Sequence, residues 1–165
     1  FLMKKLRSDL EIRKRRVPAG DMLAPEKMKA YVRHVLAHNA DLERVLIFRD
    51  CECTPAETLA ASARRVAKYL NVAFPNVKTC FIIVVHALES WLMGAPSAVE
   101  RILGEQVATG LPTAPESECR PRQFLESLAP AYDHMRDDPR LAQLAGVQEI
   151  LGRCPSFGTL RDALL

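Results

Sequence analysis

Two continuous apolar runs constrain the fold of this chain more than any other feature. They are "RVLIF" at residues 44–48 and "VKTCFIIVV" at residues 77–85. Short runs without polar alternation are typical of strands buried on both faces of a parallel sheet. Helical patterns precede and separate the two runs, and parallel strands need such crossover helices. The order of these segments predicts an α/β fold with a mostly parallel sheet and helices on both faces.

The first 95 residues are expected to contain three strands and four helices. "FLMKKLRSDL" has the apolar spacing of an amphipathic helix, and "EIRKRRVP" is predicted to be an edge strand that ends at Pro18. A turn "AGD" and a helix "PEKMKAYVRHVLAH" follow. In "TPAE", Thr54 is predicted to cap a helix that runs to about Leu70, with Glu57 completing a capping box. "HALESWLMG" is expected to form a short helix after the third strand, closed by Gly94.

Residues 96–165 contain no convincing strand. Their apolar patterns predict short helices in "SAVERIL", "PRQFLESLAPAY", "PRLAQLAG", "VQEILG" and "FGTLRDALL", separated by Pro and Gly. Asp137 or Asp138 is expected to cap a helix at Pro139, and Ser156 to cap the last helix. We therefore predict an α/β core at residues 1–95 and a helical section at residues 96–165, packed in the same domain.

Composition indicates a globular protein with a substantial core. The chain has 165 residues, of which 48% are hydrophobic, and this suits one compact domain. No apolar run approaches the roughly 18 residues of a membrane span, and no secretory signal pattern is present. Five cysteines, without a CxxC pair, favour a reduced cytoplasmic protein. Cys51 and Cys53 are interpreted as buried thiols rather than zinc ligands, for which His86 and Cys80 are the available partners.

The acidic residues after the first apolar run are the leading site candidates. Asp50 and Glu52 follow a buried strand, and α/β sheets bind ligands beyond the carboxyl ends of their strands. In an extended segment these two side chains point the same way and suit Mg²⁺, which prefers oxygen ligands. The alternative is that Asp50 caps the next helix and Glu52 faces water.

His86 and Glu89 follow the next apolar run and should reach the same sheet edge. If both lie on a helix, their i, i+3 spacing places them on one face. Glu89 is then a candidate third metal ligand or catalytic base, beside Asp50. The alternative interpretation is a histidine at a helix start and a glutamate exposed to solvent.

Basic residues indicate a polyanionic partner or, equally, a solvated surface. The net charge is +3, and the pI is about 8.7. Many of the basic residues precede Val17. The candidates for nucleic-acid binding are Arg13, Arg15, Arg49 and Arg136. No phosphate-binding glycine loop, dinucleotide fingerprint or serine nucleophile elbow is present, so these nucleotide-binding and acyl-transfer classes are unsupported.

Several segments together resemble one known family. "VLIFRDCECTPAETL", "VVHALESWLMG", "YDHMRDDPRLA" and "CPSFGTLRDAL" are similar to a bacterial family of unknown function, number 4276, which is counted among Toprim-like proteins. The resemblance implies a Toprim-like, Rossmann-like sheet. Toprim domains occur in topoisomerases, primases and nucleases, and hold Mg²⁺ with a glutamate after the first strand and a later Asp-x-Asp. By this resemblance Asp50 matches the first aspartate, Glu52 replaces the second, and Glu89 is an additional acid. The first-strand glutamate has no counterpart in residues 1–165.

Three functions remain open from the sequence. The leading hypothesis is a cytoplasmic phosphodiester-acting protein that depends on Mg²⁺ or Mn²⁺. It would be a nuclease of a bacterial defence or mobile-element system, acting on DNA or RNA with an ATPase partner subunit. The second is a regulatory or interaction subunit whose metal site has degenerated. The third is a phosphatase of the haloacid dehalogenase kind, because "DCECT" loosely resembles D-x-D-x-T with Asp50 as nucleophile.

Overall fold

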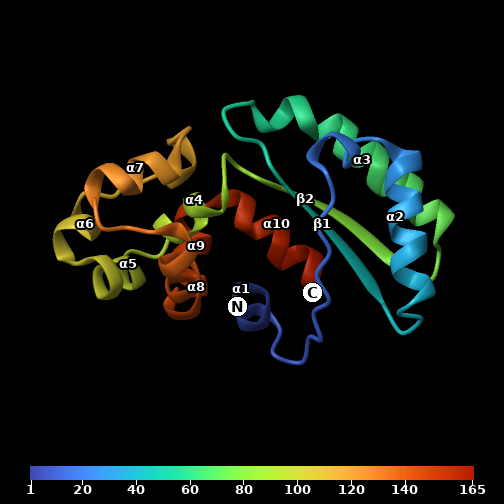
Figure 1. The fold of residues 1–165 in the computed structure, drawn as a ribbon, viewed down its shortest axis with the longest axis horizontal. Coiled ribbons are helices and arrows are strands. Elements are labelled where there is room, and N and C mark those ends of the chain that lie inside the picture. Colours follow the sequence, from blue (N-terminus) through green and yellow to red (C-terminus); the bar gives the residue numbers. More distant parts are fainter. The chain divides into compact units, whose positions relative to one another are not determined.

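The computed structural model describes residues 1–165 and divides the chain into two compact units. Unit 1 comprises Phe1–Glu11, Asp50–Thr54 and Val84–Leu165, and unit 2 comprises Ile12–Arg49 and Pro55–Ile83. Figure 1 labels the strands and α-helices of both units. The boundary that we expect at residue 95 is therefore not where the contacts divide the chain, because residues 50–54 and 84–95 group with the later helices.

Unit 2 contains most of a two-stranded sheet and two long helices. Strands β1 (Arg44–Asp50) and β2 (Lys78–Val84) are hydrogen-bonded neighbours in a parallel arrangement. Helix α2 (Pro25–Ala37) precedes β1, and helix α3 (Ala56–Ala73) connects the strands. These elements confirm the two apolar runs as strands and the α/β character of the chain.

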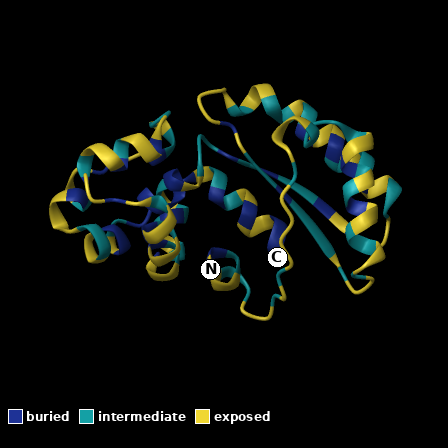
Figure 2. Ribbon diagram, in the orientation of Figure 1, coloured by how far each residue is buried: buried dark blue, intermediate teal, exposed yellow.

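The core of unit 2 lies between the helices and the sheet. Its buried members come from both helices and from β1: Met28, Val32, Ile47, Val66 and Leu70. Figure 2 shows the buried faces of α2 and α3 in dark blue and their exposed faces in yellow. The apolar spacing that predicts these helices therefore also identifies their buried faces, because helical side chains three and four positions apart share a face.

Two local predictions in unit 2 are wrong. Residues 11–18 form no strand, and side-chain hydrogen bonds hold the region instead: Arg13 bonds to Asp41, and Arg49 donates to the carbonyl oxygen of Ala19. A short 3-10 helix, η1 (Ala19–Asp21), follows. Thr54 does not cap α3, which begins at Ala56 without any side-chain cap.

Unit 1 is helical. Its elements are α1 (Leu2–Leu6), α4 (Leu88–Met93), α5 (Pro96–Leu103), α6 (Glu105–Thr109), η2 (Pro115–Ser117), α7 (Pro121–Leu128), α8 (His134–Leu144), α9 (Val147–Arg153) and α10 (Pro155–Leu164). This confirms the absence of strands after residue 95. Trp91 and Phe157 anchor the core, with ring centroids 5.0 Å apart in an edge-on contact.

The predicted helix caps in unit 1 are wrong. Asp133 caps α8 by accepting a hydrogen bond from the backbone N–H of Met135, and Pro139 lies inside this helix. Ser156 lies in the first turn of α10, where its hydroxyl accepts a hydrogen bond from the Trp91 indole instead of capping the helix. A cap residue and a residue in the first helical turn look alike in the sequence, and packing decides between them.

Each helix in the structure is too short or too polar to cross the apolar interior of a bilayer.

Candidate functional site

Asp50 stands where β1 ends, and backbone pairing continues beyond it. The N–H of Cys51 donates to the carbonyl oxygen of Val84 at 3.0 Å, and the N–H of Glu52 donates to that of His86 at 2.8 Å. The segment after β1 therefore lies beside the segment after β2. This confirms the prediction that His86 reaches the same sheet edge as Asp50.

The backbone turns sharply at both sides of this pairing. Glu52 has φ +50° and His86 has φ +60°, in the left-handed region that non-glycine residues rarely adopt. Glu52 is therefore not in an extended segment, and the prediction that Asp50 and Glu52 belong to one extended segment is wrong. The helical pairing of His86 with Glu89 is also wrong, because α4 begins at Leu88.

Glu89 is buried and holds an ion pair. It lies in the first turn of α4 with 2% of its surface exposed. The Nε of Arg122, from α7, donates to Oε1 of Glu89 at 2.6 Å. This carboxylate raises the pKa of Arg122. The interpretation of Glu89 as a solvent-facing residue is therefore excluded.

The carboxyl of Asp50 is harder to ionise than an ordinary aspartate. More than a third of the residue is exposed, yet neighbouring protein atoms remove part of the carboxyl's hydration, and this desolvation raises its pKa. The negative charges of Glu89 and Glu52 raise it further, and Arg122 opposes them, so that the pKa reaches about 6. The site thus concentrates negative charge that one arginine offsets only in part.

Asp138 and Tyr132 belong to the same electrostatic neighbourhood. Neither of them was predicted from the sequence as a site residue. The hydroxyl of Tyr132 donates to Oδ1 of Asp138. Burial raises the pKa of Asp138 to about 6; this hydrogen bond and Arg122 oppose the rise, and Glu89 adds to it. Burial, followed by Asp138, raises the pKa of Tyr132. "RDDPRLA" offered no signal to separate Asp138 from Asp137.

We call Asp50, Glu89, Arg122, Tyr132 and Asp138 the acidic site. Its oxygen-rich donor set suits a hard cation such as Mg²⁺, which binds through one or two carboxylates and keeps several waters. No three His, Cys, Asp or Glu side chains in the structure converge as metal ligands. The structure therefore contains no closed metal site made of protein ligands alone.

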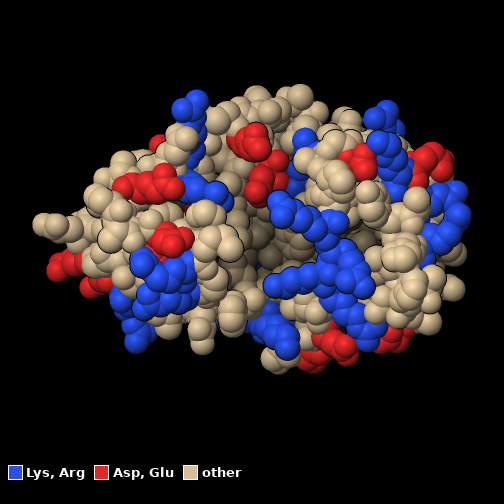
Figure 3. Space-filling model, viewed as in Figure 1, with Lys and Arg blue, Asp and Glu red and all other residues tan.

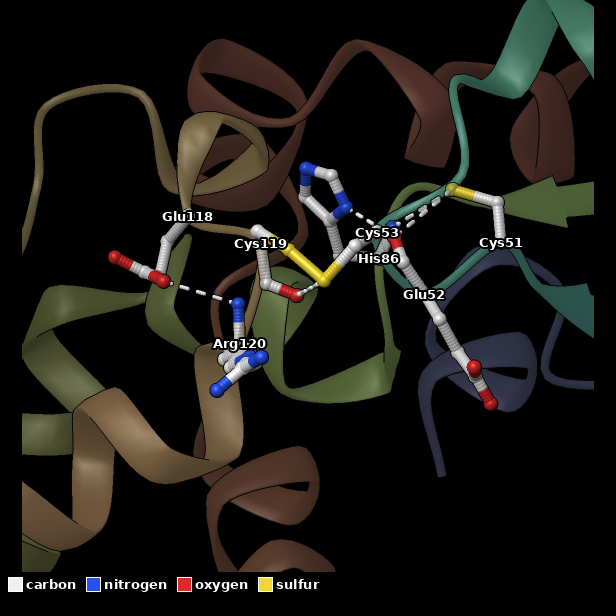
Figure 4. The surroundings of a disulfide bond; sticks show 7 residues. All are labelled: Cys51, Glu52, Cys53, His86, Glu118, Cys119 and Arg120. Carbon is white, nitrogen blue, oxygen red and sulfur yellow. Dashed lines mark hydrogen bonds between the residues drawn. A yellow bond between two sulfur atoms is a disulfide. The ribbon is translucent and has the colours of Figure 1, made fainter.

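The two cysteines beside the acids differ from each other. Cys51 is a free thiol with 3% exposure, as predicted. Cys53 is exposed and forms a disulfide with Cys119, with the Cα atoms 5.0 Å apart (Figure 4). The predictions of a buried Cys53 and of a fully reduced chain are therefore wrong. Nothing in the spacing of residues 53 and 119 could have identified the pair.

Three of the four arginines predicted to bind nucleic acid have internal partners. Arg13 bonds to Asp41, Arg49 to the carbonyl oxygen of Ala19, and Arg136 to Asp137. Arg15 is exposed without an ion pair or hydrogen bond. The same holds for its two neighbours, Lys14 and Arg16. Figure 3 shows Lys and Arg side chains in blue, and Asp and Glu side chains in red, on the face in view.

The sequence was compared with family models, curated proteins and solved structures. No curated protein and no solved structure matches it. One family model, described as a domain of unknown function (DUF4276), matches residues 3–165. This match spans nearly the whole chain, and the protein is accordingly a member of the DUF4276 family.

Proposed function

We propose that this protein acts on phosphodiester bonds with the help of Mg²⁺ or Mn²⁺, as a nuclease of Toprim type. The observation that carries the proposal is the position of Asp50 at the carboxyl end of β1, where the next residues pair with the segment after β2. The pKa of this carboxyl is raised to about 6. Desolvation is the largest cause of the raised pKa of Asp50, and two other carboxylates add to it. A divalent cation would offset the repulsion among these carboxylates. Perturbed carboxyls at such a sheet edge are typical of functional sites.

The proposed ligands are Asp50 and Glu89, with Glu52 as a further carboxylate once its loop changes conformation. A bound cation would polarise the phosphate and lower the pKa of a water molecule. Arg122 is half-exposed while it holds Glu89. Its guanidinium is therefore suited to contact a phosphate by charge-assisted hydrogen bonds.

A nucleic-acid substrate would be contacted by cations that the protein does not use internally. Lys14, Arg15 and Arg16 are consecutive, exposed and unpaired, and phosphate backbones bind such side chains without sequence preference. Four parts of the proposal rest on the family resemblance: the Toprim-like fold, a cytoplasmic location, a role in defence or mobile elements, and an ATPase partner. The structural support for the proposed fold is Asp50 at the end of a parallel strand.

The decisive experiment is a cleavage assay with DNA and RNA, single- and double-stranded, in Mg²⁺ or Mn²⁺. Asp50→Asn should reduce cleavage at least 100-fold, because it removes a ligand charge. Asp162→Asn is the matched control, since Asp162 is an exposed aspartate outside the acidic site. Equal cleavage by the wild type and Asp50→Asn would contradict the proposal. A phosphate trapped covalently on Asp50 would instead support the phosphatase alternative.

A second candidate is a regulatory or interaction subunit without catalysis. It is favoured by the Glu89–Arg122 ion pair, which already compensates the buried carboxylate, and by the lack of three converging ligands. A protein of this kind would show no thermal stabilisation by millimolar Mg²⁺ or Mn²⁺, because neither cation would bind the native state selectively.

A further inference from the structure

The Cys53–Cys119 disulfide joins two segments that belong to the acidic site. Cys53 lies three residues after Asp50, and Cys119 lies three residues before Arg122. Within unit 1 the bond therefore connects the segment of the proposed metal ligands with the segment that enters α7. The bond is therefore close in sequence to both Asp50 and Arg122.

Cys53 is the more exposed cysteine of the disulfide. The residue is exposed and Cys119 is half-buried, whereas Cys51 and Cys154 have 3% and 0% exposure. Thiol–disulfide exchange requires a thiolate to attack a disulfide sulfur directly, so its rate depends on access. Disulfides of reduced compartments, where they occur, are usually catalytic or redox-sensing.

The backbone beside the bond is held in an unfavourable conformation. Glu52, between Cys51 and Cys53, has φ +50°, and its N–H is bonded to the carbonyl oxygen of His86 at 2.8 Å. The N–H of His86 in turn donates to the sulfur of Cys51 at 3.1 Å. Figure 4 shows these contacts beside the disulfide, with the Glu52 carboxylate extending away from it. The disulfide at Cys53 and the hydrogen bonds at Glu52 and His86 therefore restrain the same short loop, in which residue 52 has an unfavourable backbone conformation.

We propose that Cys53 and Cys119 form a reversible thiol–disulfide site that fixes the Asp50–Thr54 loop to the segment before α7. A dithiol reductant would attack the disulfide, release one cysteine as a thiol and then resolve the mixed disulfide with its second sulfur. Two electrons and two protons pass to the protein, which gains two thiols, and the reductant becomes a cyclic disulfide. In the reduced protein the loop relaxes and Glu52 can project beside Asp50.

The first test measures the redox state of the disulfide and the hydrogen exchange of nearby backbone amides, and it requires no metal ion. Alkylation and mass spectrometry should label Cys53 and Cys119 together after dithiothreitol, and neither after reoxidation. Hydrogen exchange at residues 51–54 and 119–124 should be at least tenfold faster in the reduced protein. Cys53→Ser should exchange like the reduced wild type, whereas Cys80→Ser, a matched free-cysteine control, should keep the difference between the two states.

Three results would overturn the proposal. They are labelling of both cysteines in the oxidised preparation, equal exchange in both redox states, or zinc held by the two thiolates after reduction.

The consequence for cation binding rests on the proposed function. Mg²⁺ titration followed by thermal shift should give at least fivefold tighter binding in the reduced protein, because Glu52 then adds its carboxylate. Binding of equal affinity in both states would overturn this consequence. If neither state binds Mg²⁺ while hydrogen exchange still changes, the redox site stands and the proposed metal function fails.

Discussion

Two aspartates of unit 1, Asp50 and Asp137, differ in how their charge is compensated. Asp137 has 1% exposure and accepts hydrogen bonds from Arg136, Arg140 and the backbone N–H of Asp133. The Arg136 hydrogen bond is the main reason why its pKa is lowered to about 2. Asp50 is more exposed, yet its pKa is raised to about 6.

This difference shows that burial alone does not identify a functional carboxylate. Asp137 is the more deeply buried of the two, but its two arginines and its backbone donor favour the charged form. At Asp50, desolvation is the largest cause of the raised pKa, the charges of Glu89 and Glu52 add to it, and Arg122 offsets them only in part. A structural role follows for Asp137 and a ligand-binding role is proposed for Asp50.

Asp137→Asn should have the largest effect on stability. We expect a loss of about 2 kcal/mol in the free energy of unfolding at pH 7, because the charged hydrogen bonds disappear. The native-state pKa lies below the ordinary value of 3.8, so this contribution is present above about pH 4 and is lost as the pH falls towards 2. Urea denaturation from pH 2 to 7 measures it.

Asp162→Asn is the control for this prediction, because Asp162 forms an exposed pair with Arg161, its neighbour in sequence. It should change stability by less than about 0.5 kcal/mol. Equal losses in both variants would remove the distinction between a compensated buried carboxylate and a surface one.

Asp50→Asn should increase the free energy of unfolding, whereas Asp137→Asn should decrease it. The native-state pKa of about 6 lies above the ordinary 3.8, so ionisation of Asp50 weakens the native state as the pH rises from about 4 to 6. The variant lacks this penalty. We expect a gain of about 1 kcal/mol above pH 6, after allowance for screening by solvent, and none below pH 4. Urea denaturation of both proteins across this range is the measurement, and a loss of stability at pH 7 would contradict it.

Divalent cations should remove the disadvantage of ionised Asp50. At a Mg²⁺ concentration about five times the dissociation constant, the wild type should gain about 1 kcal/mol, because the ion binds only the native state. Asp50→Asn should lose this gain, whereas Asp162→Asn should keep it. A differential scanning fluorimetry series with Mg²⁺, Mn²⁺ and a K⁺ control of equal ionic strength tests this, and an equal gain in all three proteins would show binding elsewhere.

The sequence predicted what depends on local periodicity. The helices around Met28, Val66 and Trp91, and the strands at Ile47 and Ile82, follow from apolar spacing and continuous apolar runs, and the structure confirms them. The edge-strand prediction for residues 11–18 failed, because a strand needs a backbone partner that no local pattern reveals.

The candidate site was harder to predict, because its members meet only in three dimensions. Asp50 and Glu89 could be named from their positions after apolar runs. Arg122, which holds Glu89, and Asp138 come from segments that looked like ordinary helix starts. The left-handed backbone at Glu52 was missed for a different reason, since only glycine gives a strong sequence signal for positive φ.

Glu52→Gln should produce the smallest change in stability, and it tests how much the charge of Glu52 affects the pKa of Asp50. The charge of Glu52 contributes less to the raised pKa of Asp50 than burial and Glu89 do. Its removal should therefore lower this pKa slightly from about 6 and stabilise the protein by only about 0.3 kcal/mol at pH 7. Carbon-detected NMR titration of the Asp50 carboxyl measures the change directly. Glu126→Gln, an exposed glutamate on α7 that does not contribute to the shift, is the control. If the pKa of Asp50 fell further in Glu52→Gln than in Glu89→Gln, the charge of Glu52 would contribute more to this pKa than the buried carboxylate of Glu89 does.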